Sequence, residues 1–189
     1  MEADFSIEMG HDDPVLDFPW TDPAGKLAYF DLRRQPEMSA RVEEAREYPE
    51  LAEFLRSANS ARSVLESAKC DVWETGELSQ EEEIFNASHK FASYVDLVFS
   101  DIGRRGSLKR HEEFAKKLTE LLRRAPEIGA AVEICIRRCF FHDAGEVREG
   151  CYFTLYVSGY GNDVALARRN WGIAMKLVAN AIVQLSAKA

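Results

Sequence analysis

Residues 151–185 read CYFTLYVSGYGNDVALARRNWGIAMKLVANAIVQL, and this stretch decides the fold. From Cys151 to Tyr160, apolar and polar side chains alternate, which is the pattern of a β-strand with one buried face. Asn162 and Asp163 supply side-chain oxygens that can accept the free backbone N–H groups of a helix start. Apolar residues then recur at three- and four-residue spacing as far as Leu185. We therefore expect a strand followed by a long helix that packs across a sheet.

Similar patterns occur throughout the rest of the chain. Strand-like segments lie at residues 15–20, 27–32, 69–75, 90–101 and 131–142. Helix-like segments lie at residues 39–48, 49–68 and 107–126, and residues 79–82 have the spacing of a capping box that starts a short acidic helix. The polar segment 143–150 joins the strands at 131–142 and 151–160 as a hairpin. We therefore expect those two strands to be antiparallel neighbours.

The order of these elements is strand, strand, helix, and it occurs three times, over residues 15–68, 69–124 and 131–187. Hairpins separated by helices favour an α+β fold. We predict a two-layer sandwich in which an antiparallel sheet of about six strands carries helices packed on one face. A ferredoxin-like arrangement is the alternative. We expect residues 14–189 to form a single α+β domain and residues 1–13 to be a mobile acidic tail.

Composition excludes several classes of protein. The chain has 189 residues, of which 46% are hydrophobic, so it can bury a core without metal or disulfide links. Its net charge of −8 disfavours binding to nucleic acid or to an anionic membrane surface. It has neither a signal peptide pattern nor an apolar run long enough to span a membrane, so we expect a cytoplasmic protein. The four cysteines and four histidines match no metal-binding motif, and we predict no metal and no cofactor.

The candidate functional residues are those that alternation places on the sheet face away from the helices. If Val132 and Ile134 lie under the helices together with Phe153 and Leu155, the polar and aromatic residues between them share the other face. We predict that the ligand-binding residues on that face are Tyr94, Asp96, Arg137, Tyr152 and Tyr156. A register shift of one residue would move Arg137 to the opposite side.

Three interpretations of this tyrosine-rich face compete. The N-terminal segment or a second copy of the chain covers it, or it forms a small-molecule site in which Arg137 holds an anionic group. In the third interpretation it is catalytic, with a tyrosine or Asp96 in proton transfer. We predict a binding or oligomerisation module whose partner is a second subunit or a small anionic ligand. The alternative is an enzyme that acts on a small anionic substrate at the same face, and no motif decides between the two.

Overall fold

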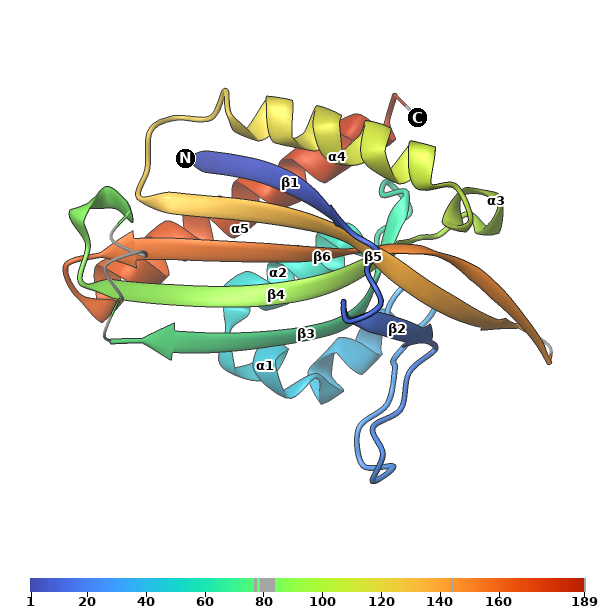
Figure 1. The fold of residues 1–189 in the computed structure, drawn as a ribbon. Helices are drawn as coiled ribbons and strands as arrows, with labels where there is room; N and C mark the ends of the chain where they lie inside the picture. The colour runs from blue at the N-terminus through green and yellow to red at the C-terminus, as the bar shows by residue number, and fades with distance from the viewer. Residues whose placement is uncertain (77, 79–83, 144, 189) are drawn as a thin grey trace.

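One six-stranded sheet organises the part of the chain described by a computed structural model, which is residues 1–76, 78, 84–143 and 145–188 (Figure 1). The strands are β1 (Glu2–Glu8), β2 (Val15–Phe18), β3 (Leu65–Thr75), β4 (His89–Phe99), β5 (Ala130–Asp143) and β6 (Glu146–Gly161). Their order is β1-β5-β6-β4-β3, and β2 also pairs with β5. The pairs β3–β4, β4–β6 and β5–β6 are antiparallel, whereas β1 and β2 run parallel to β5.

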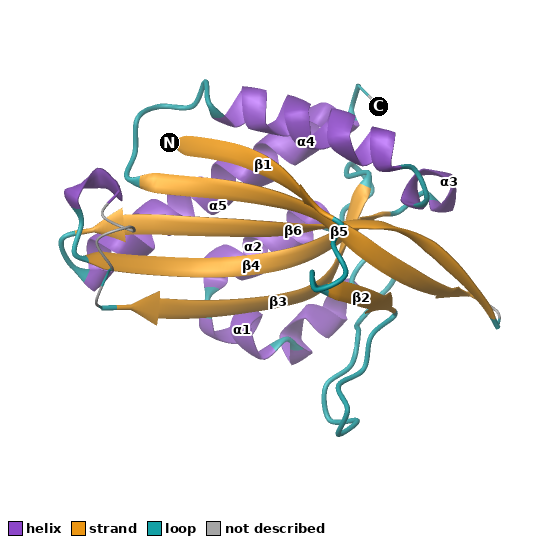
Figure 2. Cartoon of the chain, viewed as in Figure 1, coloured by secondary structure: helices purple, strands orange, loops and turns teal. Residues whose placement is uncertain are grey.

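The helices lie between strands in the chain, except for the last helix, which follows the last strand (Figure 2). They also supply much of the core. The α-helices are α1 (Glu43–Glu47), α2 (Pro49–Ala58), α3 (Ile102–Arg105), α4 (Leu108–Leu122) and α5 (Val164–Ser186), and the 3-10 helices are η1 (Pro36–Arg41) and η3 (Ile84–Asn86). Buried residues of α2, α4 and α5 form one cluster with one face of the sheet, and Trp171 of α5 is fully buried there. None of the helices within the described ranges is both long enough and apolar enough to cross a membrane.

The strand and helix predicted at residues 151–185 are confirmed as β6 and α5. Asp163 caps α5, because its side chain accepts the backbone N–H of Leu166 at 2.8 Å. β5 and β6 are antiparallel, as the hairpin predicted. β6 continues through Gly159 and Gly161, where the sequence suggested a turn. Gly159 is required there because a Cβ atom would overlap the backbone of Ala167 and Trp171 in α5.

The structure differs from the predicted mobile tail at residues 1–13. Glu2–Glu8 form β1, which lies parallel to β5 and pairs Phe5 with Ile134. Ala3, Phe5 and Ile7 alternate with polar residues, which is the same strand signal that we used elsewhere. The high acidic content of this segment hid the signal, because acidic termini are commonly disordered.

The structure also differs from the first predicted strand–strand–helix unit. Residues 27–32 contain no strand, although Thr21 and Ala28 form an isolated antiparallel bridge at the base of a hairpin loop. The helix predicted at 49–68 ends at Ala58, where Asn59 donates its side-chain amide to the carbonyl of Leu55, and β3 begins at Leu65. The sheet therefore reaches six strands with β1 in place of residues 27–32. The acidic helix predicted at 79–82 lies outside the described residues.

Candidate functional site

The predicted site residues share one face of the sheet. Tyr94 pairs with Tyr156, Asp96 with Thr154, and Arg137 with Tyr152 across neighbouring strands. The alternating apolar residues of the same strands belong to the core cluster that includes the helices. This register is the one that the alternation of residues in β5 and β6 predicted. Tyr94, Asp96, Arg137, Tyr152 and Tyr156 therefore lie on the face opposite the helices.

Arg137 lies at the centre of a hydrogen-bonded network on this face. Its Nε donates to Glu8 Oε2 at 2.7 Å, and its Nη2 lies 2.6 Å from the same oxygen. Its Nη1 donates to Thr154 Oγ1 at 2.9 Å and to the hydroxyl of Tyr156 at 3.2 Å. Burial acts to lower the pKa of Arg137, but the bonds to Tyr156 and Glu8 outweigh it and raise the pKa. The guanidinium is therefore charged and already neutralised by Glu8.

Glu8 is the member of this network that sequence reasoning missed. It stands at the end of β1 opposite Arg137 and is held there by the parallel pairing of β1 with β5. Burial acts to raise its pKa, but the hydrogen bond and charge of Arg137 outweigh that effect and lower the pKa. An anionic ligand at Arg137 would therefore have to displace a carboxylate that belongs to the chain.

Asp96 is a buried carboxylate joined to this network through Thr154. Thr154 Oγ1 donates to Asp96 Oδ1 at 2.7 Å, and only 6% of Asp96 is exposed. Burial raises the pKa of Asp96 to about 6, although Thr154, Lys69 and Arg137 act in the opposite direction. Asp96 can therefore exchange a proton close to neutral pH, but it does so beneath other side chains.

Tyr152 is separated from the open part of the face. It is buried in a second apolar cluster, to which the N-terminal segment contributes. The cluster comprises Leu16, Phe18, Ala68, Val98, Cys139, Phe141 and Tyr152, with Trp20 and Tyr29 packed against it. Burial, followed by the charge of Asp96, raises the pKa of Tyr152 to about 12. The N-terminal segment thus covers one end of the face, as one of the three interpretations expected.

An aromatic row crosses the part of the face that remains accessible. It consists of Trp73 on β3, Tyr94 on β4 and Tyr156 on β6. The ring centroids of Trp73 and Tyr94 are 6.4 Å apart, and those of Tyr94 and Tyr156 are 6.2 Å apart. Trp73 is 37% exposed, and both tyrosines are partly exposed. Trp73 was not among the predicted site residues. It lies in the predicted strand 69–75, and the register of that strand decides which face of the sheet its side chain occupies.

The charges around the aromatic row are predominantly acidic. Asp71 and Glu133 are exposed, and pairing places them beside Tyr94 and Tyr156. Lys69 is the exposed cation on this part of β3, and its Nζ lies 5.3 Å from the ring centroid of Trp20. An acidic surface with aromatic rings attracts cationic groups more strongly than anionic ones.

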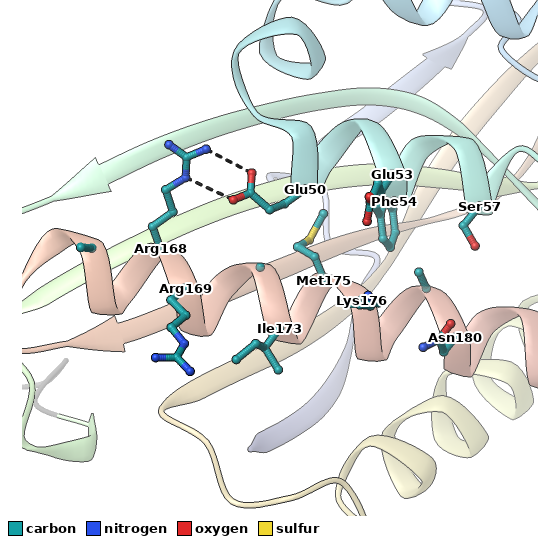
Figure 3. A pocket seen from close by; sticks show the side chains of 13 residues that line it. Glu50, Glu53, Phe54, Ser57, Arg168, Arg169, Ile173, Met175, Lys176 and Asn180 are labelled. Atoms are coloured by element: carbon teal, nitrogen blue, oxygen red, sulfur yellow. Dashed lines mark hydrogen bonds and ion pairs between the residues drawn. The ribbon is translucent and has the colours of Figure 1, made fainter.

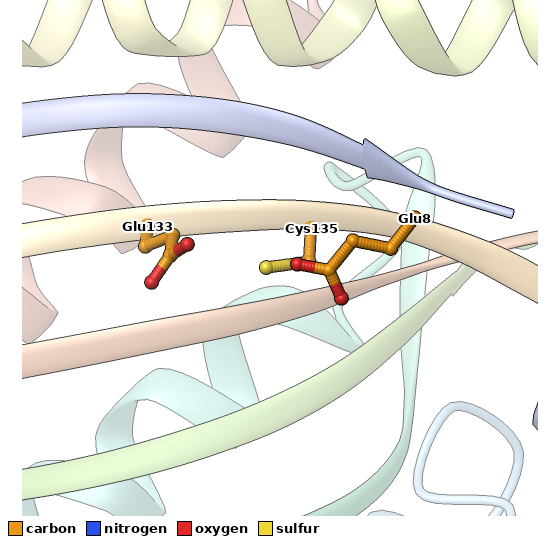
Figure 4. A group of neighbouring side chains, drawn as sticks. All are labelled: Glu8, Glu133 and Cys135. Carbon is orange, nitrogen blue, oxygen red and sulfur yellow. The ribbon is translucent and has the colours of Figure 1, made fainter. Parts of the chain in front are cut away.

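Within the described ranges, three residues of β1 and β5 bring together atoms that could hold a metal ion. The relevant atoms of Glu8, Glu133 and Cys135 lie within 4.8 Å of one another (Figure 4). Glu8 is already paired with Arg137, whose positive charge would repel a cation. Burial raises the pKa of Cys135 to about 12, so its sulfur is a protonated thiol. These residues are poorly suited to holding a metal.

A cavity lies on the helical side of the molecule, away from the predicted site. It has a volume of about 660 Å³ between α2 and α5, and Phe54 and Met175 contribute to its lining (Figure 3). Arg168 of α5 donates to Glu50 of α2 at 3.2–3.3 Å across it. This ion pair links the two helices, and none of the predicted site residues lines the cavity.

Comparisons with known proteins do not identify the chain: no family model, no curated protein and no solved structure matches it.

Proposed function

We propose that this protein is a binding module that docks a partner protein on the aromatic row formed by Trp73, Tyr94 and Tyr156. The observation that carries the proposal is the contact of these three partly exposed rings across three neighbouring strands. The proposal includes the two-layer arrangement, in which helices cover one face of the sheet and leave the other for binding. A ferredoxin-like arrangement would leave the same face uncovered.

Physical chemistry favours a macromolecular partner with basic groups. Tryptophan and tyrosine supply large contact areas at a low cost in side-chain entropy, and they dominate the binding energy of many interfaces. Asp71 and Glu133 lie beside the rings and would complement lysine or arginine side chains. A second copy of the same face would bring these carboxylates towards one another. A heterologous basic partner is therefore favoured over a homodimer.

A small anionic ligand is the weaker candidate, and so is an enzyme acting on an anionic substrate. Both require Arg137 to hold the anion, and Glu8 occupies its guanidinium. Asp96, whose pKa burial raises to about 6, lies beneath the surface and accepts a hydrogen bond from Thr154, which is only 2% exposed. Either activity would need the Glu8 carboxylate to leave Arg137.

Site-specific photo-crosslinking tests the proposal. A benzophenone amino acid would replace Tyr94 or Tyr156 on the face, and Ile173 on α5 as the control, because Ile173 is 38% exposed on the helical side. After irradiation in cells, we expect adducts at positions 94 and 156 with one partner that carries a basic surface, and no such adduct at 173. Adducts with the chain itself would replace the proposed partner by a second copy. Equal labelling at all three positions would contradict the proposal.

Native mass spectrometry of the purified protein tests the alternatives directly. We expect the mass of a single subunit without a bound small molecule. A dimer would favour the oligomerisation alternative, and a retained anionic species would favour a pocket at Arg137. In the second case Arg137→Ala should remove the added mass while the protein stays folded.

A further inference from the structure

The two outer strands of the sheet are protected to different extents. Arg123 of the segment after α4 reaches the outer edge of β1, where its Nε donates to the carbonyl of Ala3 at 2.8 Å. A side chain from another element that lies across a strand edge hinders the addition of another strand. An added strand at the start of β1 would have to displace Arg123.

The first half of β3 is protected in the same way. Arg33 Nη1 donates to the carbonyl of Leu65 at 3.3 Å, and Trp20 Nε1 donates to that of Ala68 at 2.6 Å. In the second half, Cys70–Thr75, the described residues provide pairing only from β4. Val72 shows which groups face outward: its N–H is accepted by the side chain of the exposed Asp71 at 2.7 Å, and an added strand would have to displace that carboxylate. Alternation then directs the backbone of Cys70, Val72 and Glu74 away from β4.

A pocket adjoins this edge of β3. It has a volume of about 320 Å³ and lies between β3, α1 and the hairpin loop that follows β2. Its apolar lining includes Trp20, Phe30, Leu32, Val42 and Leu55, and its charged lining is Lys26, Lys69, Glu43, Glu44 and Asp71. Such a pocket suits a long basic side chain, whose aliphatic part contacts apolar residues while its charged end meets carboxylates.

Acidic residues along this edge favour a basic partner segment. Glu43 and Glu44 at the start of α1 stand near Asp71, and Glu74 follows on β3. Burial, followed by the charges of Asp71 and Glu43, raises the pKa of Glu44. Three carboxylates line the pocket against two lysines, Lys26 and Lys69, so the lining carries a net negative charge. A second copy of β3 would add more carboxylates, whereas a basic strand would neutralise them.

We propose that the edge Cys70–Thr75 binds an extended, basic segment of a partner protein as an additional β-strand, with one lysine or arginine side chain in the adjoining pocket. Trp73 of the aromatic row lies within this segment, but the inference uses the backbone edge and the adjoining pocket, so it stands without docking on the rings. Backbone hydrogen bonds supply affinity in this mode of recognition, and the pocket supplies specificity.

The probe is a synthetic peptide of alternating arginine and valine, compared by calorimetry with two control peptides. One control has glutamate in place of arginine, and the other has the parent sequence with every backbone amide N-methylated. We expect only the unmethylated basic peptide to bind. Equal binding of the N-methylated peptide would overturn the proposal, because it would show attraction without strand pairing. Failure of the basic peptide to bind would also overturn it.

Protein variants locate the binding site. Val72→Pro blocks an added strand without removing a hydrogen bond to β4, and we expect it to weaken binding roughly tenfold. Val72→Thr keeps the N–H group and should bind like the parent. Because Val72 packs partly against the core, Glu44→Lys provides a second variant, which reverses a charge in the pocket lining and should also weaken binding.

Tyr156→Asp separates the edge from the aromatic row. It should leave peptide binding unchanged, whereas loss of binding in this variant alone would place the peptide on the face and overturn the edge proposal. Circular dichroism and the melting temperature would show that each variant is folded.

Discussion

Burial of the Asp96 carboxyl makes the stability of the folded protein depend on pH. Its pKa of about 6 in the folded protein lies above the ordinary value of 3.8. Folding therefore favours the protonated form. The stabilisation that comes from protonating Asp96 in the folded protein is fully present below the unfolded-state pKa. It is lost as the pH rises through about 6. A shift of this size corresponds to roughly 3 kcal/mol.

We predict that Asp96→Asn stabilises the protein at alkaline pH. The amide oxygen can still accept the hydrogen bond from Thr154, but no charge is buried. Urea unfolding should show a gain of about 2–3 kcal/mol at about pH 8 and almost none at about pH 4. Asp71→Asn, which removes an exposed carboxylate on the same face, is the control and should show no comparable change. Equal effects of Asp96→Asn at both pH values would contradict this account.

At the scale of the elements, Gly159 determines how closely α5 approaches β6. The backbone of Ala167 and Trp171 occupies the space that a Cβ atom would need. We predict that Gly159→Ala destabilises the protein by about 3 kcal/mol, because the helix must move outward. Gly76→Ala is the matched control: nothing lies within 4 Å of its added Cβ, so its melting temperature should stay close to that of the parent. Similar melting temperatures for the two variants would show that α5 shifts at little cost.

β1 provides the second test at this scale. Deleting residues 1–8 removes a strand from β5 and leaves Arg137 buried without Glu8. We predict a loss of at least about 3–5 kcal/mol in the free energy of unfolding, measured by urea denaturation. Glu8→Gln keeps the strand but removes the charge, so it should cost less than the deletion. If the deletion leaves stability unchanged, residues 1–8 behave as the tail that the sequence suggested.

At the scale of the whole molecule, the modification of three buried cysteines depends on global unfolding, because a reagent reaches a buried thiol only when the protein unfolds. Cys135, Cys139 and Cys151 are free and buried, whereas Cys70 is partly exposed near the edge of β3. Burial raises the pKa of Cys70 and that of Cys135 to about 12, which suppresses the reactive thiolate. We predict that iodoacetamide modifies Cys70 first and the other three together, at the rate of global unfolding. Mass spectrometry of the native protein over time measures this order, and rapid modification of Cys139 in folded protein would contradict it.

Local pattern was sufficient for part of this fold. Alternation identified β4, β5 and β6, and three- and four-residue spacing identified α5, because each pattern depends only on neighbouring residues and on one buried face. The hairpin between β5 and β6 made their antiparallel pairing predictable. Alternation also assigned Tyr94, Asp96, Arg137, Tyr152 and Tyr156 to one face, since strand side chains change sides at every residue.

Tertiary structure decided the rest. The parallel pairing of β1 with β5 joins Glu8 to Arg137 across 129 positions of sequence, and it turned an expected anion-binding arginine into a neutralised one. The same long-range packing buried Tyr152 under the N-terminal segment and left Trp73, Tyr94 and Tyr156 in the accessible row. Periodicity records which side of a strand a residue occupies. Which distant segment covers that side depends on the free energy of packing the whole chain, and no local pattern contains that information.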